Sequence, residues 1–159
     1  MIARSKSPRV LIVDDHEDTR EMLVLLLNPL GVELAAVSTA SQALRLSQTE
    51  SFDLYLLDAW LSDLDGVELC RRLRMIDPHA FVVFFSGAAY ESDRQKAMDA
   101  GANAYVCKPA IDELISTISK FTAESAGSAA RAVPGRNIAP LQLVTLSSFI
   151  LITDMPVLM

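Results

Sequence analysis

The segment VLIVDD, residues 10–15, shows the pattern that decides the fold. Its first four residues are apolar and rich in β-branched side chains, which is typical of a short strand buried on both faces. Two carboxylates, Asp14 and Asp15, follow the strand directly. A buried strand that ends abruptly in charged residues favours a parallel sheet with polar groups at one edge.

The same pattern recurs four more times, and a helix is predicted after each strand. The further strands are predicted at residues 32–37, 54–57, 81–85 and 104–107. Apolar residues at helical spacing predict the helices: Met22, Leu23, Leu26 and Leu30; Ala40, Ala43 and Leu44; Val67, Cys70 and Leu73; residues 92–100; and Ile111, Leu114, Ile115 and Ile118. Helix ends are predicted at Pro29 with Gly31, at Ser38 or Thr39, at Gly66, where the third helix begins, and at Gly101.

Five strand–helix units in a row indicate the α/β class, with a doubly wound five-stranded parallel sheet and helices on both faces. Right-handed crossovers leave few topologies, and the flavodoxin-like strand order 2-1-3-4-5 is favoured. Ligands of such sheets bind beyond the carboxyl ends of the strands, near the topological switch point. We therefore expect the functional site at that edge.

The predicted strand ends carry Asp14, Asp15, Asp58, Ser86 and Lys108. Each alone has a simpler interpretation, as a helix cap, a turn residue or a solvated lysine, but their placement at one edge indicates a chemical site. Three clustered carboxylates repel one another, and Mg²⁺, which prefers oxygen ligands, would relieve the repulsion. A carboxylate there can act as a nucleophile and become an acyl phosphate. A hydroxyl and an ammonium would contact the transferring oxygens.

The chain resembles a known family, the receiver domains of two-component response regulators. The resemblance covers roughly residues 8–121 and is carried by four segments: VLIVDDHEDTR (10–20), LYLLDAWLSDLDGVEL (54–69), VVFFSG (82–87) and GANAYVCKP (101–109). It implies a CheY-like single-domain regulator in a phosphorelay.

The resemblance implies a phosphoacceptor and a metal site. Asp58 would accept a phosphoryl group from a sensor histidine kinase or a histidine phosphotransfer protein. Asp15 and Asp58 would bind Mg²⁺ directly, Asp14 would act through a water, and the backbone carbonyl of Trp60 would complete the protein ligands.

The resemblance also implies a switch. Lys108 would contact the acyl phosphate, Ser86 would move to hydrogen-bond it, and Tyr105 would turn inward as the coupled aromatic. The peptide bond before Pro109 would be cis, which X–Pro bonds tolerate far better than others.

Two features depart from the family pattern. Leu61 and Ser62 stand where the family often has Met-Pro, which loosens the loop but removes no ligand. Bulky Trp60 and small Ala88 occupy the two positions that flank the attacking water in the family. We hypothesise that the Trp60 ring shields the acyl phosphate and slows its hydrolysis.

The composition limits the partners. The net charge of −6 argues against direct binding of nucleic acid, because phosphate binding needs a basic surface. The two cysteines, Cys70 and Cys107, are too few for a disulfide framework and lack metal-ligand spacing, so a reducing cytoplasm is expected. No apolar stretch precedes Val10, so no signal peptide is expected.

The chain is expected to divide into a receiver domain (1–121), a flexible linker (122–140) and an apolar tail (141–159). The linker is rich in Ala, Ser and Gly. Asp154 and Pro156 interrupt the tail and argue against a membrane span. A docking segment for a partner or for a second copy, and thus a homodimer, stays open, as does an end without function. The residues after 121 are too few for a DNA-binding output domain.

The leading interpretation is a signalling module, not an enzyme acting on other substrates. Phosphorylation would shift its population between two states and change its contacts with a downstream protein effector. The alternative is a phosphorylation-independent interaction domain that keeps the fold, and the intact set of site residues argues against it. A phosphohydrolase would resemble a pattern with a second aspartate two positions after Asp58, where Trp60 stands.

Overall fold

The structure is a computed structural model, and it describes residues 7–128. Its strands are β1 Arg9–Val13, β2 Glu33–Val37, β3 Leu54–Leu57, β4 Phe81–Ser86 and β5 Ala104–Cys107. Its helices are α1 Glu17–Leu27, α2 Ala40–Thr49, α3 Gly66–Ile76, α4 Glu91–Asp99 and α5 Ile111–Ser128, with a 3-10 turn, η1, at Asn28–Leu30. Strands and helices alternate along these residues, as the repeated pattern predicted.

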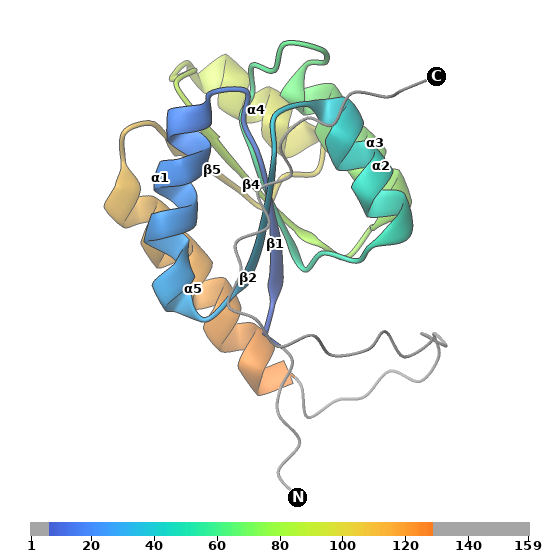
Figure 1. Ribbon diagram of the computed structural model, residues 1–159. Coiled ribbons are helices and arrows are strands. Elements are labelled where there is room, and N and C mark those ends of the chain that lie inside the picture. Colours follow the sequence, from blue (N-terminus) through green and yellow to red (C-terminus); the bar gives the residue numbers. More distant parts are fainter. Residues whose placement is uncertain (1–6, 129–159) are drawn as a thin grey trace, which may run out of the picture.

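All five strands form one parallel sheet in the order β2-β1-β3-β4-β5. β1 lies between β2 and β3, and its last residue, Val13, stands beside Val37 and Leu57. The predicted α/β fold and the flavodoxin-like strand order are confirmed. Because the strands run in one direction, their carboxyl ends share one edge, near the start of α1 (Figure 1).

Two hydrophobic cores cover the two faces of the sheet. Leu11 and Val13 pack on one face with residues of α2, α3 and α4. Val10 and Ile12 pack on the other face with residues of α1 and α5. Figure 1 shows α1 and α5 on one side of the sheet and α2 and α3 on the other. Burial on both faces explains why the strands are continuous apolar runs rather than alternating ones.

The buried face of α1 differs from the prediction at Met22. Leu23 and Leu27 are fully buried, whereas 37% of the Met22 side chain surface is exposed. Neighbouring residues of a helix point about 100° apart, so turning Leu23 toward the sheet turns Met22 away from it. The predicted helix end is confirmed, since η1 follows α1 and Gly31 takes the left-handed conformation with φ 71°.

The last helix is longer than the sequence predicted. α5 runs to Ser128, so residues 122–128, expected to belong to a linker, are helical. Residues that extend a firmly packed helix add a hydrogen bond each without a new nucleation cost, and α5 is anchored by buried Leu114 and Ile118 and by the Phe121 ring stacked on Phe81. The rest of the proposed linker and the apolar tail lie outside the described residues.

No helix among residues 7–128 is both long enough and apolar enough to cross a membrane.

Candidate functional site

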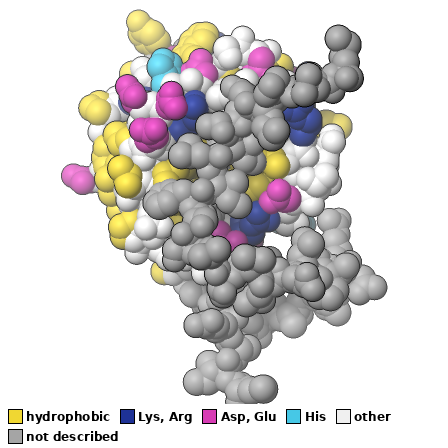
Figure 2. All heavy atoms as spheres, viewed as in Figure 1, with side chains coloured by type: hydrophobic (Ala, Val, Ile, Leu, Met, Phe, Trp, Pro, Cys, Tyr) yellow, Lys and Arg dark blue, Asp and Glu magenta, His cyan; other side chains and the backbone are white. Residues whose placement is uncertain are grey.

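Buried carboxylates meet at the carboxyl edge of the sheet. Asp14 follows β1 and Asp58 follows β3, and both are almost completely buried. Their backbones extend the sheet pairing, because Asp14 N–H donates to Val37 O and Asp58 N–H donates to Val13 O. Asp15 lies beside them and is partly exposed. Acidic side chains gather over this part of the molecule in the space-filling view (Figure 2). Neighbouring strand ends therefore bring the predicted carboxylates together.

Lys108 supplies the positive charge of this cluster. Its Nζ lies 2.8 Å from Asp14 Oδ2 and 3.4 Å from Asp58 Oδ2. Its backbone N–H donates to Ser86 O at 2.9 Å, which ties the end of β5 to the end of β4. The Lys108–Pro109 peptide bond is cis. A cation held between two buried carboxylates offsets their mutual repulsion.

The donor set fits a divalent cation. One atom each of Asp14, Asp15, His16 and Asp58 lie within 4.8 Å of one another. Asp15 Oδ1 is buried without a hydrogen-bond partner among the described residues, although His16 Nδ1 lies 2.8 Å from it. A buried carboxylate oxygen without a donor is costly unless a cation binds it. Carboxylate oxygens are the ligands that Mg²⁺ prefers.

The loop after Asp58 folds back over the site. Trp60 N–H donates weakly to Asp58 Oδ1 at 3.4 Å, and Trp60 pairs with Asp65 in an isolated antiparallel bridge. Asp65 caps α3 by accepting from Val67 N–H at 2.7 Å. Gly66 packs so closely that a Cβ there would overlap the Asp58 carbonyl oxygen. The sequence predicted Gly66 only as a helix start, because a close approach between loops leaves no periodic signal.

A second connection joins the loop to α2. Asp63 accepts from Ala40 N–H at 3.0 Å and from both the N–H and the hydroxyl of Ser41, so it caps α2 from a distant loop. Thr39 caps the same helix locally by accepting from Gln42 N–H, as predicted. The role of Asp63 was not predicted, since its partners lie more than 20 residues away in the chain.

Ser86 and Tyr105 both bind Ala88, in the loop after β4. Ser86 is fully buried, and its Oγ accepts from Ala88 N–H at 3.3 Å. The Tyr105 ring is buried and stacks on Phe84, and its hydroxyl donates to Ala88 O at 2.6 Å. Burial raises the pKa of Tyr105, with an opposing contribution from Ser86. Tyr105 thus faces inward in the structure, linked to Ser86 through one loop residue.

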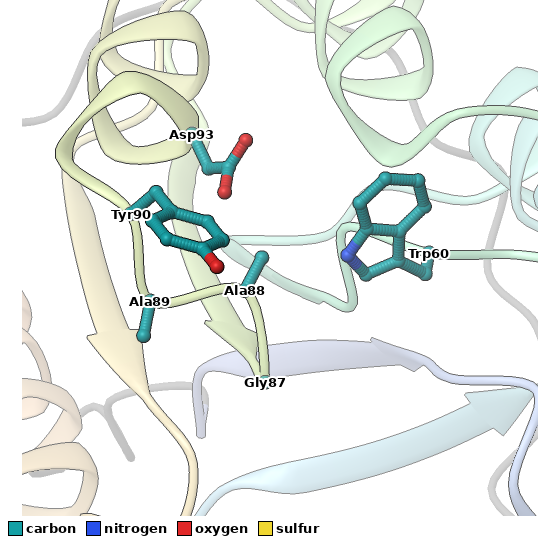
Figure 3. Close-up of a pocket in the computed structure, with 6 residues that line it drawn as sticks. All are labelled: Trp60, Gly87, Ala88, Ala89, Tyr90 and Asp93. Carbon is teal, nitrogen blue, oxygen red and sulfur yellow. The ribbon is translucent and has the colours of Figure 1, made fainter.

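A groove opens beside the carboxylates. Trp60 lies on one side of it, opposite Tyr90 and Ala88, with Asp93 on the α4 side (Figure 3). The Trp60 side chain is 67% exposed, so its ring stands at the rim of the site rather than in the core. The small side chain of Ala88 leaves the opposite side of the groove open.

The sequence that builds this site matches a family of known proteins. Residues 10–119 match the family described as response regulator receiver domain. The chain belongs to this family. The predicted family is therefore confirmed, and the matched residues include all the strand-end residues of the site.

Relatives of this receiver domain include longer proteins. The chain is 32% identical over 101 residues to the alkaline phosphatase synthesis transcriptional regulatory protein PhoP of Bacillus subtilis, covering 64% of the chain and 42% of PhoP. It is 30% identical over 138 residues to the transcriptional regulatory protein PrrA of Mycobacterium tuberculosis, covering 86% of the chain and 59% of PrrA. The chain thus spans about half the length of these relatives.

Solved receiver structures show the same fold. A CheY-like receiver domain from Methanospirillum hungatei superposes with a TM-score of 0.72 at 28% identity, covering 77% of this chain and 99% of that one. The receiver domain of the sensor histidine kinase PA1611 from Pseudomonas aeruginosa gives 0.67 at 25% identity, covering 74% and 99%. The latter structure holds a magnesium ion coordinated in its active site cleft.

Proposed function

We propose that this receiver domain accepts a phosphoryl group on Asp58 from a phosphohistidine, in a reaction that depends on Mg²⁺. The donor is a sensor histidine kinase or a histidine phosphotransfer protein in the cytoplasm. The observation that carries the proposal is the pairing of buried Asp58 with Lys108, beside Asp14 and an Asp15 oxygen that has no hydrogen-bond partner within residues 7–128.

Each side chain at the sheet edge has a separate role in the phosphoryl transfer. An Asp58 carboxylate oxygen attacks the phosphorus, the P–N bond breaks, and the donor histidine leaves as an imidazole. Lys108 neutralises the oxygens of the transferring group. Asp15, Asp58 and the Trp60 carbonyl would hold Mg²⁺, with Asp14 acting through water. When bound, Mg²⁺ supplies positive charge to the phosphoryl oxygens.

The phosphate is sensed through Ala88. A phosphoryl group on Asp58 offers stronger acceptors to Ser86 Oγ than the surrounding protein does. Movement of Ser86 shifts its bond to Ala88 N–H, and Tyr105 holds the carbonyl of the same residue. The surface formed by α4, β5 and α5 near Tyr105 then contacts a downstream protein effector. The reaction is confined to self-phosphorylation and self-dephosphorylation.

The second candidate is a phosphorylation-independent interaction domain that keeps the receiver fold. The intact set of Asp14, Asp58 and Lys108 at the sheet edge argues against it.

The test is the intact mass of the full chain after incubation with acetyl phosphate and Mg²⁺, compared with Asp58→Asn. We expect a gain of one phosphoryl group that is absent in the variant and in EDTA. A phosphohistidine donor is then tested in the same way. No gain from either donor, with folded protein, would replace the proposal with the phosphorylation-independent interaction domain.

A further inference from the structure

His16 places an imidazole nitrogen, a possible metal ligand, in the carboxylate cluster. Its Nδ1 lies 2.8 Å from Asp15 Oδ1 and 3.4 Å from Asp14 Oδ1. It belongs with Asp14, Asp15 and Asp58 to the group whose donor atoms lie within 4.8 Å of one another. The cluster is therefore a set of carboxylate oxygens with one imidazole at its open side, since the His16 side chain is 72% exposed.

The helix does not account for this orientation of the imidazole. His16 is the N-cap residue of α1, but its side chain makes no capping hydrogen bond. The residues favoured at N-caps are Ser, Thr, Asp and Asn, whose side-chain oxygens accept from the first turn. The imidazole instead makes a close polar contact with Asp15 Oδ1, an oxygen that has no aligned hydrogen bond among the described residues.

We propose that His16 Nδ1 is a ligand of the divalent cation held by Asp15 and Asp58, so that the site favours Mn²⁺ over Mg²⁺. The inference rests on the proposed function, in which this site binds a metal. Imidazole nitrogen suits transition-metal ions, whereas Mg²⁺ prefers oxygen alone. Mn²⁺ accepts the carboxylates as readily as Mg²⁺ does. The imidazole nitrogen therefore favours Mn²⁺ while the carboxylate ligands stay the same.

The distances allow such a site after small side-chain movements. Two donors on opposite sides of an ion, each about 2.1 Å from it, stand about 4.2 Å apart. The four donor atoms here are all within 4.8 Å of one another. His16 and Asp15 are both partly exposed and can rotate, whereas buried Asp14 and Asp58 are held by Lys108.

The first test is electron spin-echo envelope modulation of Mn²⁺ bound to the full chain. We expect ¹⁴N modulation from a coordinated imidazole in the native chain, and its loss in His16→Gln. The chain has two histidines, and the second, His79, lies in an exposed turn before β4 at the opposite edge of the sheet. His79→Gln is therefore the matched control and should retain the modulation.

The outcomes separate the two proposals. Bound Mn²⁺ without ¹⁴N modulation would overturn the role of His16 and leave the phosphoacceptor proposal standing, provided that Asp58→Asn weakens binding. Absence of Mn²⁺ binding to the folded chain would overturn both.

A second readout uses the single tryptophan of the chain, Trp60, which lies in the loop over the site. Titrations of its fluorescence with MgCl₂ and MnCl₂ give the two dissociation constants. Loss of a residue that only orients a metal ligand already changes metal affinity by about 10–100-fold, so loss of a direct nitrogen ligand in His16→Gln should reduce the preference for Mn²⁺ over Mg²⁺ by about tenfold or more. An unchanged preference would contradict the inference.

Discussion

Trp60 stands at the rim of the groove beside Asp58, with its backbone N–H on the Asp58 carboxylate and its ring largely in solvent. A bulky ring there would hinder the approach of water to an acyl phosphate. We expect Trp60→Asn to shorten the lifetime of the phosphoryl group on Asp58 severalfold, measured by intact mass after removal of the donor. Met75→Asn, which removes another exposed apolar side chain, should leave the lifetime as it is. An unchanged lifetime in Trp60→Asn would show that the ring does not shield the site.

The strand-end residues were predictable because chain direction alone places them together. Once the strands are parallel, Asp14, Asp58 and Lys108 must share an edge, and the 2.8 Å and 3.4 Å contacts of Lys108 with the two buried carboxylates confirm that they do. The orientation of His16 was not predictable, because its single χ1 choice decides whether the imidazole faces solvent or the carboxylates. The inward position of Tyr105 was implied by the family resemblance only for the switched state.

At the scale of elements, the N-terminus of α3 packs directly on the residue that carries the site. A Cβ on Gly66 would overlap the Asp58 carbonyl oxygen and crowd Ala59, so the backbone would have to shift. We expect Gly66→Ala to lower the free energy of unfolding by about 1–3 kcal/mol, the usual cost of overpacking, measured by urea denaturation. Gly87→Ala is the control, since a Cβ there meets nothing within 4 Å. Equal stability of the two variants would show that the loop adjusts freely.

Asp63 gives the contact between the β3–α3 loop and α2 a dependence on pH. Burial would raise the pKa of Asp63, but hydrogen bonds from Ser41 and Ala40 outweigh it and hold the pKa below its usual value. A lowered pKa means that the carboxylate stabilises the fold above its unfolded pKa and loses this effect as the pH falls through the folded one. The native chain should therefore be more stable than Asp63→Asn at neutral pH, and the difference should vanish in acid.

Thermal unfolding of both chains across the acid range measures this difference. A gap that persists at the lowest pH would mean that the capping geometry, rather than the charge of Asp63, stabilises α2.

Element boundaries were predicted well where a chemical signal marks them and poorly where packing alone decides. Thr39, Gly31 and Gly101 end or begin helices as expected, because caps and left-handed glycines have local causes. The end of α5 was placed too early, since the Ala- and Ser-rich composition after Phe121 suits a helix extension as well as a linker. The buried face of α1 was predicted about one position off because residues 22–27, MLVLLL, are all apolar and do not mark one face.

At the scale of the whole molecule, two buried hydrogen bonds through Ala88 connect the sheet edge that carries Asp58 with the surface of α4, β5 and α5. Tyr105 donates to Ala88 O, and Ala88 N–H donates to Ser86 Oγ, so we expect the ring to respond to a change in what Ser86 binds. Tyr105→Phe removes the hydroxyl and keeps the ring stacked on Phe84. Loss of one such bond costs only about 1 kcal/mol, so the variant should fold and Asp58 should still be phosphorylated.

What Tyr105→Phe should lose is the response of the distant surface. In the native chain we expect phosphorylation to change amide hydrogen exchange in α4 and β5. In the variant we expect a smaller change, although intact mass shows the same fraction of phosphorylated chains. Tyr90→Phe removes a hydroxyl from an exposed ring in the same loop and is the matched control. If Tyr105→Phe responds like the native chain, the signal reaches α4 without the Tyr105 hydroxyl, which contacts both Ala88 O and Ser86.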